Sequence, residues 1–141
     1  MKIGYTTGVF DLFHIGHLKV LKEASNNCDY LIVGVSTDEL VMSYKNRKPI
    51  ISYEDRSEII SYLQFVDKVV PQTDFSKVDA YHKYNFDILF HGDDWKGSSK
   101  YEEIENTLKS FGVEFVYFPY TKGVSTSLIK TKIYELLDIM K

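Results

Sequence analysis

Short apolar runs and longer amphipathic stretches alternate along the whole chain. The apolar, β-branched runs predict five strands, at residues 2–7, 30–35, 66–70, 88–91 and 114–118. The amphipathic stretches predict helices at about 17–27, 53–64, 77–84, 100–111 and 126–139. Because strands and helices alternate, we expect an α/β fold: a Rossmann-like, doubly wound sheet of five parallel strands with helices on both faces. Such sheets bind ligands beyond the carboxyl ends of their strands.

Polar pairs mark where two of the helices should begin. Ser36 is followed three residues later by Glu39, and Ser52 by Asp55, which is the spacing of a capping box or a close variant of it. We therefore expect helix caps at Ser36 and Ser52. An apolar stripe along the last predicted helix consists of Ile129, Ile133, Leu136 and Leu137.

Length and composition limit what the chain can be. With 141 residues, 44% of them hydrophobic, we expect a single domain spanning residues 1–141. A net charge of -3 argues against a broad nucleic-acid or membrane surface, so an anion site must be local. One cysteine cannot form an internal disulfide, and the sequence shows neither a bilayer-spanning apolar run nor a signal-peptide core. We expect a cytoplasmic protein that binds no nucleic acid and inserts into no membrane.

Two histidines at the end of the first predicted strand are the strongest chemical signal. His14 and His17 stand three residues apart in the string G-V-F-D-L-F-H-I-G-H, and residues three apart become neighbours once a helix begins. Gly16 removes a side chain that would hold a phosphate away. Free N–H groups and the helix dipole add to an anion pocket at this junction. The string therefore predicts a nucleotide phosphate site.

Two other interpretations of the histidines remain open. They could be ordinary surface residues of a helix, or half of a zinc site. Cys28, His82 and His91 do not lie at a spacing that completes a tetrahedral zinc set. The phosphate site is therefore the interpretation that we carry forward.

A basic loop precedes the helix predicted to begin after Ser52. Its cations are Lys45, Arg47 and Lys48, which suit a triphosphate or a phosphorylated acceptor. A plain solvated loop is the alternative. Arg56, in the first turn of that helix, we interpret as a charge on the helix surface rather than a catalytic group.

Two further segments should reach the same edge of the sheet. After the fourth strand, the run H-G-D-D-W-K-G contains Asp94, which could accept hydrogen bonds from a nucleotide or hold the water shell of Mg²⁺, and Trp95, which could shield the site. At the start of the last helix, the run T-K-G-V-S-T-S offers hydroxyl and backbone N–H groups to phosphates. An acidic turn without function, and simple N-capping by Ser125 or Thr126, are the alternatives.

The motifs together resemble the cytidylyltransferase family of nucleotidyltransferases. The similarity is carried by G-V-F-D-L-F-H-I-G-H, S-Y-E-D-R, F-V-D-K-V, H-G-D-D-W-K-G and G-V-S-T-S, and the G-D-D-W-x-G element points to the glycerol-3-phosphate branch. The resemblance implies the HIGH-type nucleotidyltransferase fold and transfer of CMP from CTP to a small phosphorylated acceptor. Glycerol 3-phosphate is the first choice of acceptor, with CDP-glycerol and pyrophosphate as products. It also implies Mg²⁺ and a homodimer.

The same resemblance assigns roles to individual residues. It makes His14, His17 and Lys45 catalytic, and it makes Lys45, Lys77 and Trp95 ligands of the acceptor. Asp11 or Asp94 would be the candidates for contacting the metal ion. The nucleotide would be bound by Thr7, Gly8, Val9, Phe10, Asp11, Gly16, Arg47, Gly92, Asp94, Tyr120, Thr121, Gly123, Val124, Ser125 and Thr126.

Two departures keep other activities open. Gln64 and Tyr120 stand where the cytidylyltransferases usually have arginines. A last motif without arginine also resembles the ATP-dependent adenylyltransferases of heptose-phosphate type, which act on sugar phosphates. A CTP:phosphocholine or phosphoethanolamine cytidylyltransferase is a further alternative. A nucleotide-binding module without turnover and a dimeric scaffold are the non-enzymatic ones.

Overall fold

A computed structural model describes residues 1–92, 99–119 and 123–140. Its strands are β1 (Ile3–Gly8), β2 (Tyr30–Ser36), β3 (Lys68–Gln72), β4 (Ile88–Gly92) and β5 (Glu114–Phe118). Its helices are α1 (Ile15–Asn26), α2 (Asp38–Lys45), α3 (Tyr53–Ser61), α4 (Lys77–Tyr84), α5 (Ser99–Ser110) and α6 (Thr126–Met140). Strands and helices thus alternate much as the apolar pattern predicts.

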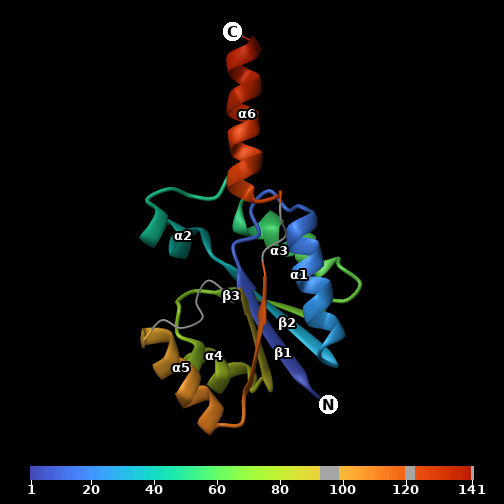
Figure 1. The fold of residues 1–141 in the computed structure, drawn as a ribbon, viewed down its shortest axis with the longest axis vertical. Coiled ribbons are helices and arrows are strands. Elements are labelled where there is room, and N and C mark those ends of the chain that lie inside the picture. Colours follow the sequence, from blue (N-terminus) through green and yellow to red (C-terminus); the bar gives the residue numbers. More distant parts are fainter. Residues whose placement is uncertain (93–98, 120–122, 141) are drawn as a thin grey trace.

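The strands form one parallel sheet in the order β3-β2-β1-β4-β5 (Figure 1). β1 lies at the centre, and its last residue, Gly8, is in register with Val35 of β2. The chain order reverses between β1 and β4, which is where ligands bind in open α/β sheets. This arrangement confirms the predicted fold class and places the end of β1 at the expected binding edge.

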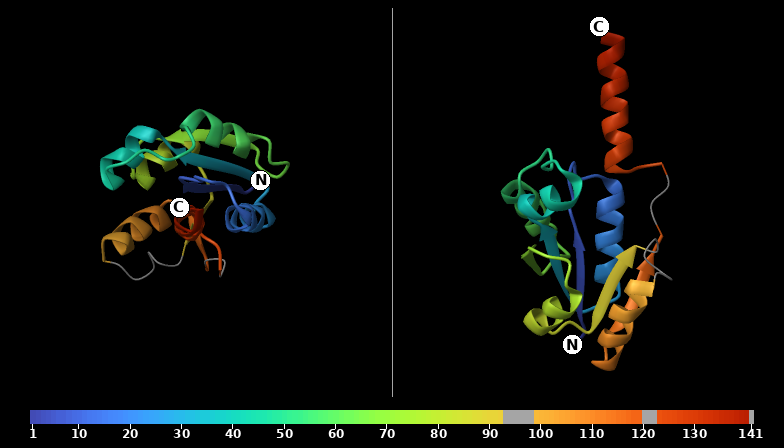
Figure 2. Two further views of the ribbon diagram at one scale, coloured as in Figure 1. Left: turned by 90° about the horizontal axis from the view of Figure 1, so that it is seen from above. Right: turned by 90° about the vertical axis from the view of Figure 1, so that its left-hand side faces the viewer.

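Helices cover both faces of the sheet (Figure 2). On one face, Leu21 of α1 and Ile60 of α3 are completely buried in a cluster with the sheet residues Val33 and Phe90. On the other face, Leu108 of α5 packs with Tyr5, Phe86 and Leu89, and side chains of α4 join that cluster from its edge. The two cores hold the sheet rigid, so the loops at its carboxyl edge start from fixed positions.

One of the two predicted helix caps is wrong. Thr37 caps α2, because its side chain accepts a hydrogen bond from the Leu40 N–H at 3.2 Å. Ser36 instead ends β2, where its buried hydroxyl donates to Gln72 at 2.8 Å. Ser52 does cap α3 as predicted, accepting from the Asp55 N–H at 3.3 Å. The strand β2 runs one residue further than its apolar pattern suggests, which moves the cap by one position.

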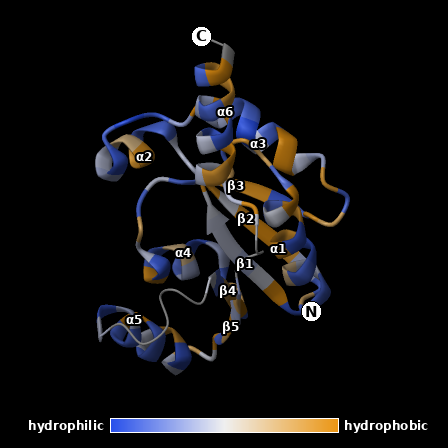
Figure 3. Ribbon diagram, turned by 45° about the horizontal axis from the view of Figure 1, so that its top comes forward, coloured by the Kyte–Doolittle hydropathy of each residue, from blue (hydrophilic) through white to orange (hydrophobic). Residues whose placement is uncertain are grey.

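The last helix extends away from the sheet (Figures 1 and 2). Most of its predicted apolar stripe does not pack against the body: Ile133, Leu136 and Leu137 are 46%, 59% and 49% exposed, whereas Ile129, near the start of the helix, is partly buried. Figure 3 shows hydrophobic stretches along the ribbon of α6. Within the part of the chain that the structure describes, no helix combines the length and apolar character needed to cross a membrane.

Candidate active site

The loop that follows β1 is organised by the carboxylate of Asp11. This buried side chain accepts hydrogen bonds from the N–H groups of Ile50 and Ile51 at 2.8 and 2.9 Å, and from the Leu12 N–H at 3.1 Å. Phe10 and Leu12 have φ angles of 57° and 50°, a backbone conformation that is costly without glycine. The Asp11 contacts hold the loop in that conformation and fix the base of the basic loop beside it.

Asp11 also joins this loop to the start of α6. Its carbonyl accepts a hydrogen bond from the Thr126 hydroxyl at 2.9 Å, and its carboxylate lies 3.8 Å from the ammonium of Lys130. With three N–H donors and one ammonium around it, the carboxylate has little capacity left for a metal ion. Thr126, predicted to bind nucleotide, is engaged here in joining two segments that are 115 residues apart.

The two histidines form a reciprocal cap on α1. The backbone N–H of Gly16 donates to Nδ1 of His14 at 3.0 Å, and the backbone N–H of His14 donates to Nδ1 of His17 at 3.2 Å. The rings stack with their centroids 3.7 Å apart. Phe10 and Phe13 each lie 5.4 Å from the His17 ring. The imidazole pair is therefore held from several sides.

These contacts fix which nitrogen of each ring carries the proton. A neutral imidazole that accepts at Nδ1 is protonated at Nε2. Burial lowers the pKa of His14, and burial together with the charge of His14 lowers the pKa of His17 to about 4, against an opposing effect of Asp11. At neutral pH the pair is uncharged and presents two Nε2–H donors. Among the described residues, no side chain or carbonyl takes up these donors in a hydrogen bond.

Gly16 has a different role from the one predicted. A Cβ at this position would lie 2.9 Å from Cε1 and 3.0 Å from Nδ1 of His14, and 3.3 Å from Cγ1 of Val124. The space above Gly16 is thus filled by the His14 ring rather than left for a phosphate. The same contact shows that Val124, in the last motif, lies next to the histidine pair.

Gly16→Ala is expected to reduce kcat by about ten- to a hundredfold, because the added methyl group displaces the His14 ring by a fraction of an ångström to 1 Å. Its free energy of unfolding should change by less than about 1 kcal/mol, because the better helix propensity of alanine offsets much of the cost of displacing the capping His14 ring. Steady-state kinetics and thermal unfolding measure the two effects separately. Loss of stability in parallel with activity would contradict this role of Gly16.

Acid should destabilise the protein through two histidines. Burial lowers the pKa of His17 to about 4, and burial and the nearby Lys77 charge lower the pKa of His91 to about 3, from 6.5. As pH falls below about 6.5, the unfolded chain binds these two protons and the folded chain does not, so the free energy of unfolding decreases. His17 and His91 together should bring the slope close to two protons between pH 6 and about 4.5, and the lowered pKa of His14 adds to it in the same direction. Urea titrations across this pH range measure the slope, and His17→Asn should reduce it by about one proton.

Arg56 is not a surface charge as predicted but a buried one, only 1% exposed. Its guanidinium donates to the carbonyls of Val9, Ser36 and Ile51 at 2.6, 2.8 and 2.9 Å. It also forms an ion pair with Asp38 at 2.7 Å. Arg56 thereby joins the end of β2, the loop after β1 and the base of the basic loop. A sequence signal existed: arginine in the first turn of a helix opposes the helix dipole and so needs another reason to be there.

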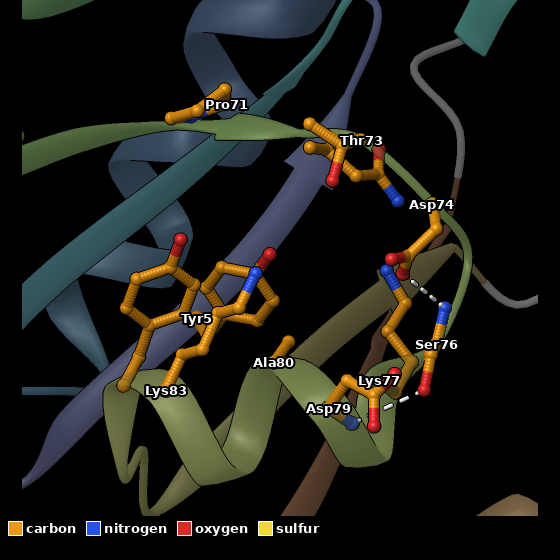
Figure 4. A pocket seen from close by; sticks show the side chains of 11 residues that line it. Tyr5, Pro71, Thr73, Asp74, Ser76, Lys77, Asp79, Ala80 and Lys83 are labelled. Carbon is orange, nitrogen blue, oxygen red and sulfur yellow. Dashed lines mark hydrogen bonds between the residues drawn. The ribbon is translucent and has the colours of Figure 1, made fainter.

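Lys77 lies on the other side of the β1 edge, at the start of α4. It is 7% exposed, and its ammonium donates to the Thr7 hydroxyl at 2.7 Å. Burial lowers its pKa to about 8, against the opposing charge of Asp74. Figure 4 shows the small pocket beside it, between the β3–α4 loop and α4. The nearby His91 has a buried Nε2 without a partner among the described residues.

The remaining predicted residues fall into four groups. Gly8 lies beneath the Phe10 ring, and the ring itself is buried, so the structure shows packing for both. Ser125 accepts from the Leu128 N–H at 3.0 Å as a helix cap, and Gly123 has a φ of 81° with open space around it. Gly92 ends β4, and the cations of the basic loop are exposed. The predicted residues that lie outside the described ones are Asp94, Trp95, Tyr120 and Thr121.

The structure therefore brings the histidine pair, the base of the basic loop and the start of α6 together at one edge of the sheet. Two imidazole donors, a helix N-terminus and nearby cations are suited to a polyphosphate. Among the described residues there is no group of three side chains that could hold a metal ion. The parallel sheet, with a candidate polyphosphate site at its carboxyl edge, is the arrangement of a nucleotidyltransferase type of fold.

Comparison with known proteins narrows this class. The "Cytidylyltransferase-like" family model matches residues 5–132, and the chain belongs to that family. A glycerol-3-phosphate cytidylyltransferase of Bacillus spizizenii is 41% identical over 96% of this chain and 100% of its own length. One from Staphylococcus aureus is 34% identical over 95% of this chain and 96% of its own.

A solved structure gives the same picture of the fold. The lipopolysaccharide core biosynthesis protein from Thermoplasma volcanium matches with a TM-score of 0.71 and 27% identity, over 88% of this chain and 99% of that one. The likeness thus extends over sequence and structure alike.

Proposed function

We propose that this chain is a glycerol-3-phosphate cytidylyltransferase, which transfers CMP from CTP to glycerol 3-phosphate and releases pyrophosphate. The main support is the histidine pair, whose Nδ1 atoms are both held by backbone N–H groups, so that two Nε2–H donors remain for a triphosphate. Relatives that carry this name match the chain over nearly its whole length. The geometry of the site supports binding of a triphosphate, and the names of the relatives support CTP as the nucleotide and glycerol 3-phosphate as the acceptor.

The reaction is an in-line displacement at the α-phosphorus of CTP. A phosphate oxygen of the acceptor forms the new P–O bond, and the bond to the β-phosphate oxygen breaks as pyrophosphate leaves. The attacking phosphate is already ionised at neutral pH, so the protein needs no general base and no covalent nucleophile. Catalysis consists of positioning the reactants and stabilising charge on the phosphoryl oxygens.

Each group at the site has a place in this scheme. His14 and His17 donate from Nε2 to triphosphate oxygens, and the negative charge that develops there raises the affinity of the rings for a second proton. Lys45 neutralises charge between the triphosphate and the acceptor. Lys77 binds the acceptor phosphate, and its ammonium gives up the hydrogen bond to the Thr7 hydroxyl when it does so. The N–H groups at the start of α6 face the distal phosphates.

Three further properties belong to the proposal. The reaction requires Mg²⁺, which neutralises charge on the triphosphate; because the Asp11 carboxylate is fully engaged, we propose that the ion arrives bound to CTP rather than to this side chain. The enzyme acts as a homodimer. It works in the cytoplasm, where CTP is supplied.

A grid of nucleotides and acceptors tests the proposal. Purified protein is incubated with CTP, ATP, GTP or UTP against glycerol 3-phosphate, phosphocholine, phosphoethanolamine and heptose phosphate, and pyrophosphate release is measured. CTP with glycerol 3-phosphate should give the highest kcat/KM, and phosphorus NMR should identify CDP-glycerol. The proposal is overturned if the protein prefers ATP with a sugar phosphate, if it prefers an amino-alcohol phosphate as acceptor, or if it binds nucleotide without turnover.

Two further measurements test the metal ion and the dimer. Chelation of divalent cations should abolish turnover, and light scattering should give the mass of a dimer.

A further inference from the structure

Two exposed aromatic rings meet at the carboxyl edge of the sheet. Tyr44, near the end of α2, is 46% exposed, and Phe75, in the loop between β3 and α4, is 54% exposed. Their centroids lie 5.2 Å apart in an edge-to-face arrangement with planes at 74°. Large aromatic side chains that remain half exposed contribute less to the free energy of folding than buried core residues do. A role other than stability would explain why two of them lie here.

The ammonium of Lys45 lies over the Tyr44 ring, 5.8 Å from the ring centroid. This is within the range of a cation–π interaction. Lys45 is the last residue of α2, and the following Asn46 has a φ of 56° and turns the chain into the basic loop. The long lysine side chain would otherwise be unrestrained at this exposed position, so the ring limits where its charge can lie.

Phe75 connects this ring to the opposite side of the site. It stands two residues before Lys77, directly after Asp74, whose carboxylate accepts from the Ser76 N–H at 2.9 Å and whose charge acts on Lys77. The aromatic pair therefore spans two separate segments, one bearing Lys45 and the other leading to Lys77. In the proposed reaction both lysines contact the acceptor, Lys45 from between the acceptor and the triphosphate.

We infer that Tyr44 and Phe75 are positioning residues, which hold the Lys45 ammonium on the side of the site where the phosphorylated acceptor binds. This inference rests on the proposed function, because it concerns the use of Lys45 in that reaction. Phe75 fixes the Tyr44 ring, and the ring face fixes the direction of the lysine. Neither aromatic side chain needs to touch a reacting atom.

Loss of the ring should weaken the use of the acceptor more than that of CTP. Tyr44→Leu and Phe75→Leu should each raise the KM for glycerol 3-phosphate by about three- to tenfold, the scale of one cation–π or aromatic contact. The Kd for CTP should change by a smaller factor, because the two histidine donors to the triphosphate are untouched. Tyr44→Phe, which keeps the ring, should retain most of the wild-type value. Tyr62→Leu, at an 81% exposed tyrosine of the α3 end, is the matched control.

A double-mutant cycle shows whether the ring acts through the lysine. In a Lys45→Met background, Tyr44→Leu should have no further effect on the KM for the acceptor, since the group that it positions is gone. The inference is overturned if the two effects add, if Tyr44→Leu leaves the KM unchanged, or if it weakens CTP binding equally.

A spectroscopic measurement separates this inference from the proposed function. Reductive methylation with labelled formaldehyde keeps the charge of Lys45 and gives its dimethylammonium group an NMR signal, assigned with Lys45→Arg. The Tyr44 ring should shift this signal upfield, and both Tyr44→Leu and Phe75→Leu should move it toward the position of a solvated lysine. An unchanged signal would disprove the positioning role whatever substrates the enzyme uses. If the signal moves and the substrate grid shows no CTP-dependent turnover, the proposed function alone is wrong.

Discussion

His17→Ala is expected to lower kcat by about 10²- to 10³-fold, the usual cost of removing one preorganised donor to a charged transition state. His17 is the better of the two histidines to replace, because its ring is surrounded by His14, Phe10 and Phe13. Another hydrogen-bond donor cannot move into its place when the ring is removed. Pyrophosphate release at saturating CTP and glycerol 3-phosphate measures the effect.

The matched control is His82→Ala, since His82 is exposed on α4 and remote from the proposed chemistry. It should keep the wild-type kcat. His17→Asn, which retains a donor of shorter reach, should fall between the wild type and His17→Ala. A His17→Ala enzyme that turned over within threefold of the wild type would remove the histidines from the mechanism.

Arg56→Met is expected to lower the free energy of unfolding by about 3–5 kcal/mol, because it leaves the Asp38 carboxylate without its partner and three carbonyls without their donor. That is a large part of the stability of a domain of this size. Chemical denaturation at neutral pH measures the change. Activity should fall as well, since Arg56 holds the loops that contain Val9 and Ile51, on either side of the site, through their carbonyls.

Arg47→Met provides the comparison for this change, because Arg47 is exposed in the basic loop. Its stability should stay within about 0.5 kcal/mol of the wild type. Arg56→Lys, which keeps the charge but cannot reach four acceptors at once, should be destabilised to an intermediate degree. An Arg56→Met protein as stable as the wild type would mean that the buried ion pair has no net effect.

The sequence predicted the frame of the fold well, and the reason is local. Runs such as 30–35 and 114–118 are apolar and β-branched, and their periodicity differs from that of the intervening helices. Their alternation leaves few topologies other than a parallel, doubly wound sheet. The clustering of the two histidines was predictable for a similar reason, because His14, Gly16 and His17 lie within four residues of the chain; that they hold a phosphate stays a prediction.

The errors concern contacts between distant segments. Arg56 reaches carbonyls as far away as Val9, 47 residues earlier; its place in the first turn of a helix signals another role, but no local pattern identifies these partners. Asp11 likewise meets its partners 39 and 40 residues later. The apolar stripe of α6 gave a correct helix, but periodicity cannot tell what, if anything, covers that stripe. Tertiary geometry alone reveals these features.

The most direct test of the histidine mechanism is nitrogen NMR of the imidazole rings during a CTP titration at pH 7. Both histidines of the pair should show the neutral form protonated at Nε2 before CTP is added, and both Nε2 signals should shift as CTP saturates the protein, whereas His82 should not respond. If the His14 and His17 signals stayed unchanged at saturating CTP, the pair would not hold the triphosphate, and the proposed catalytic role of the two rings would be wrong.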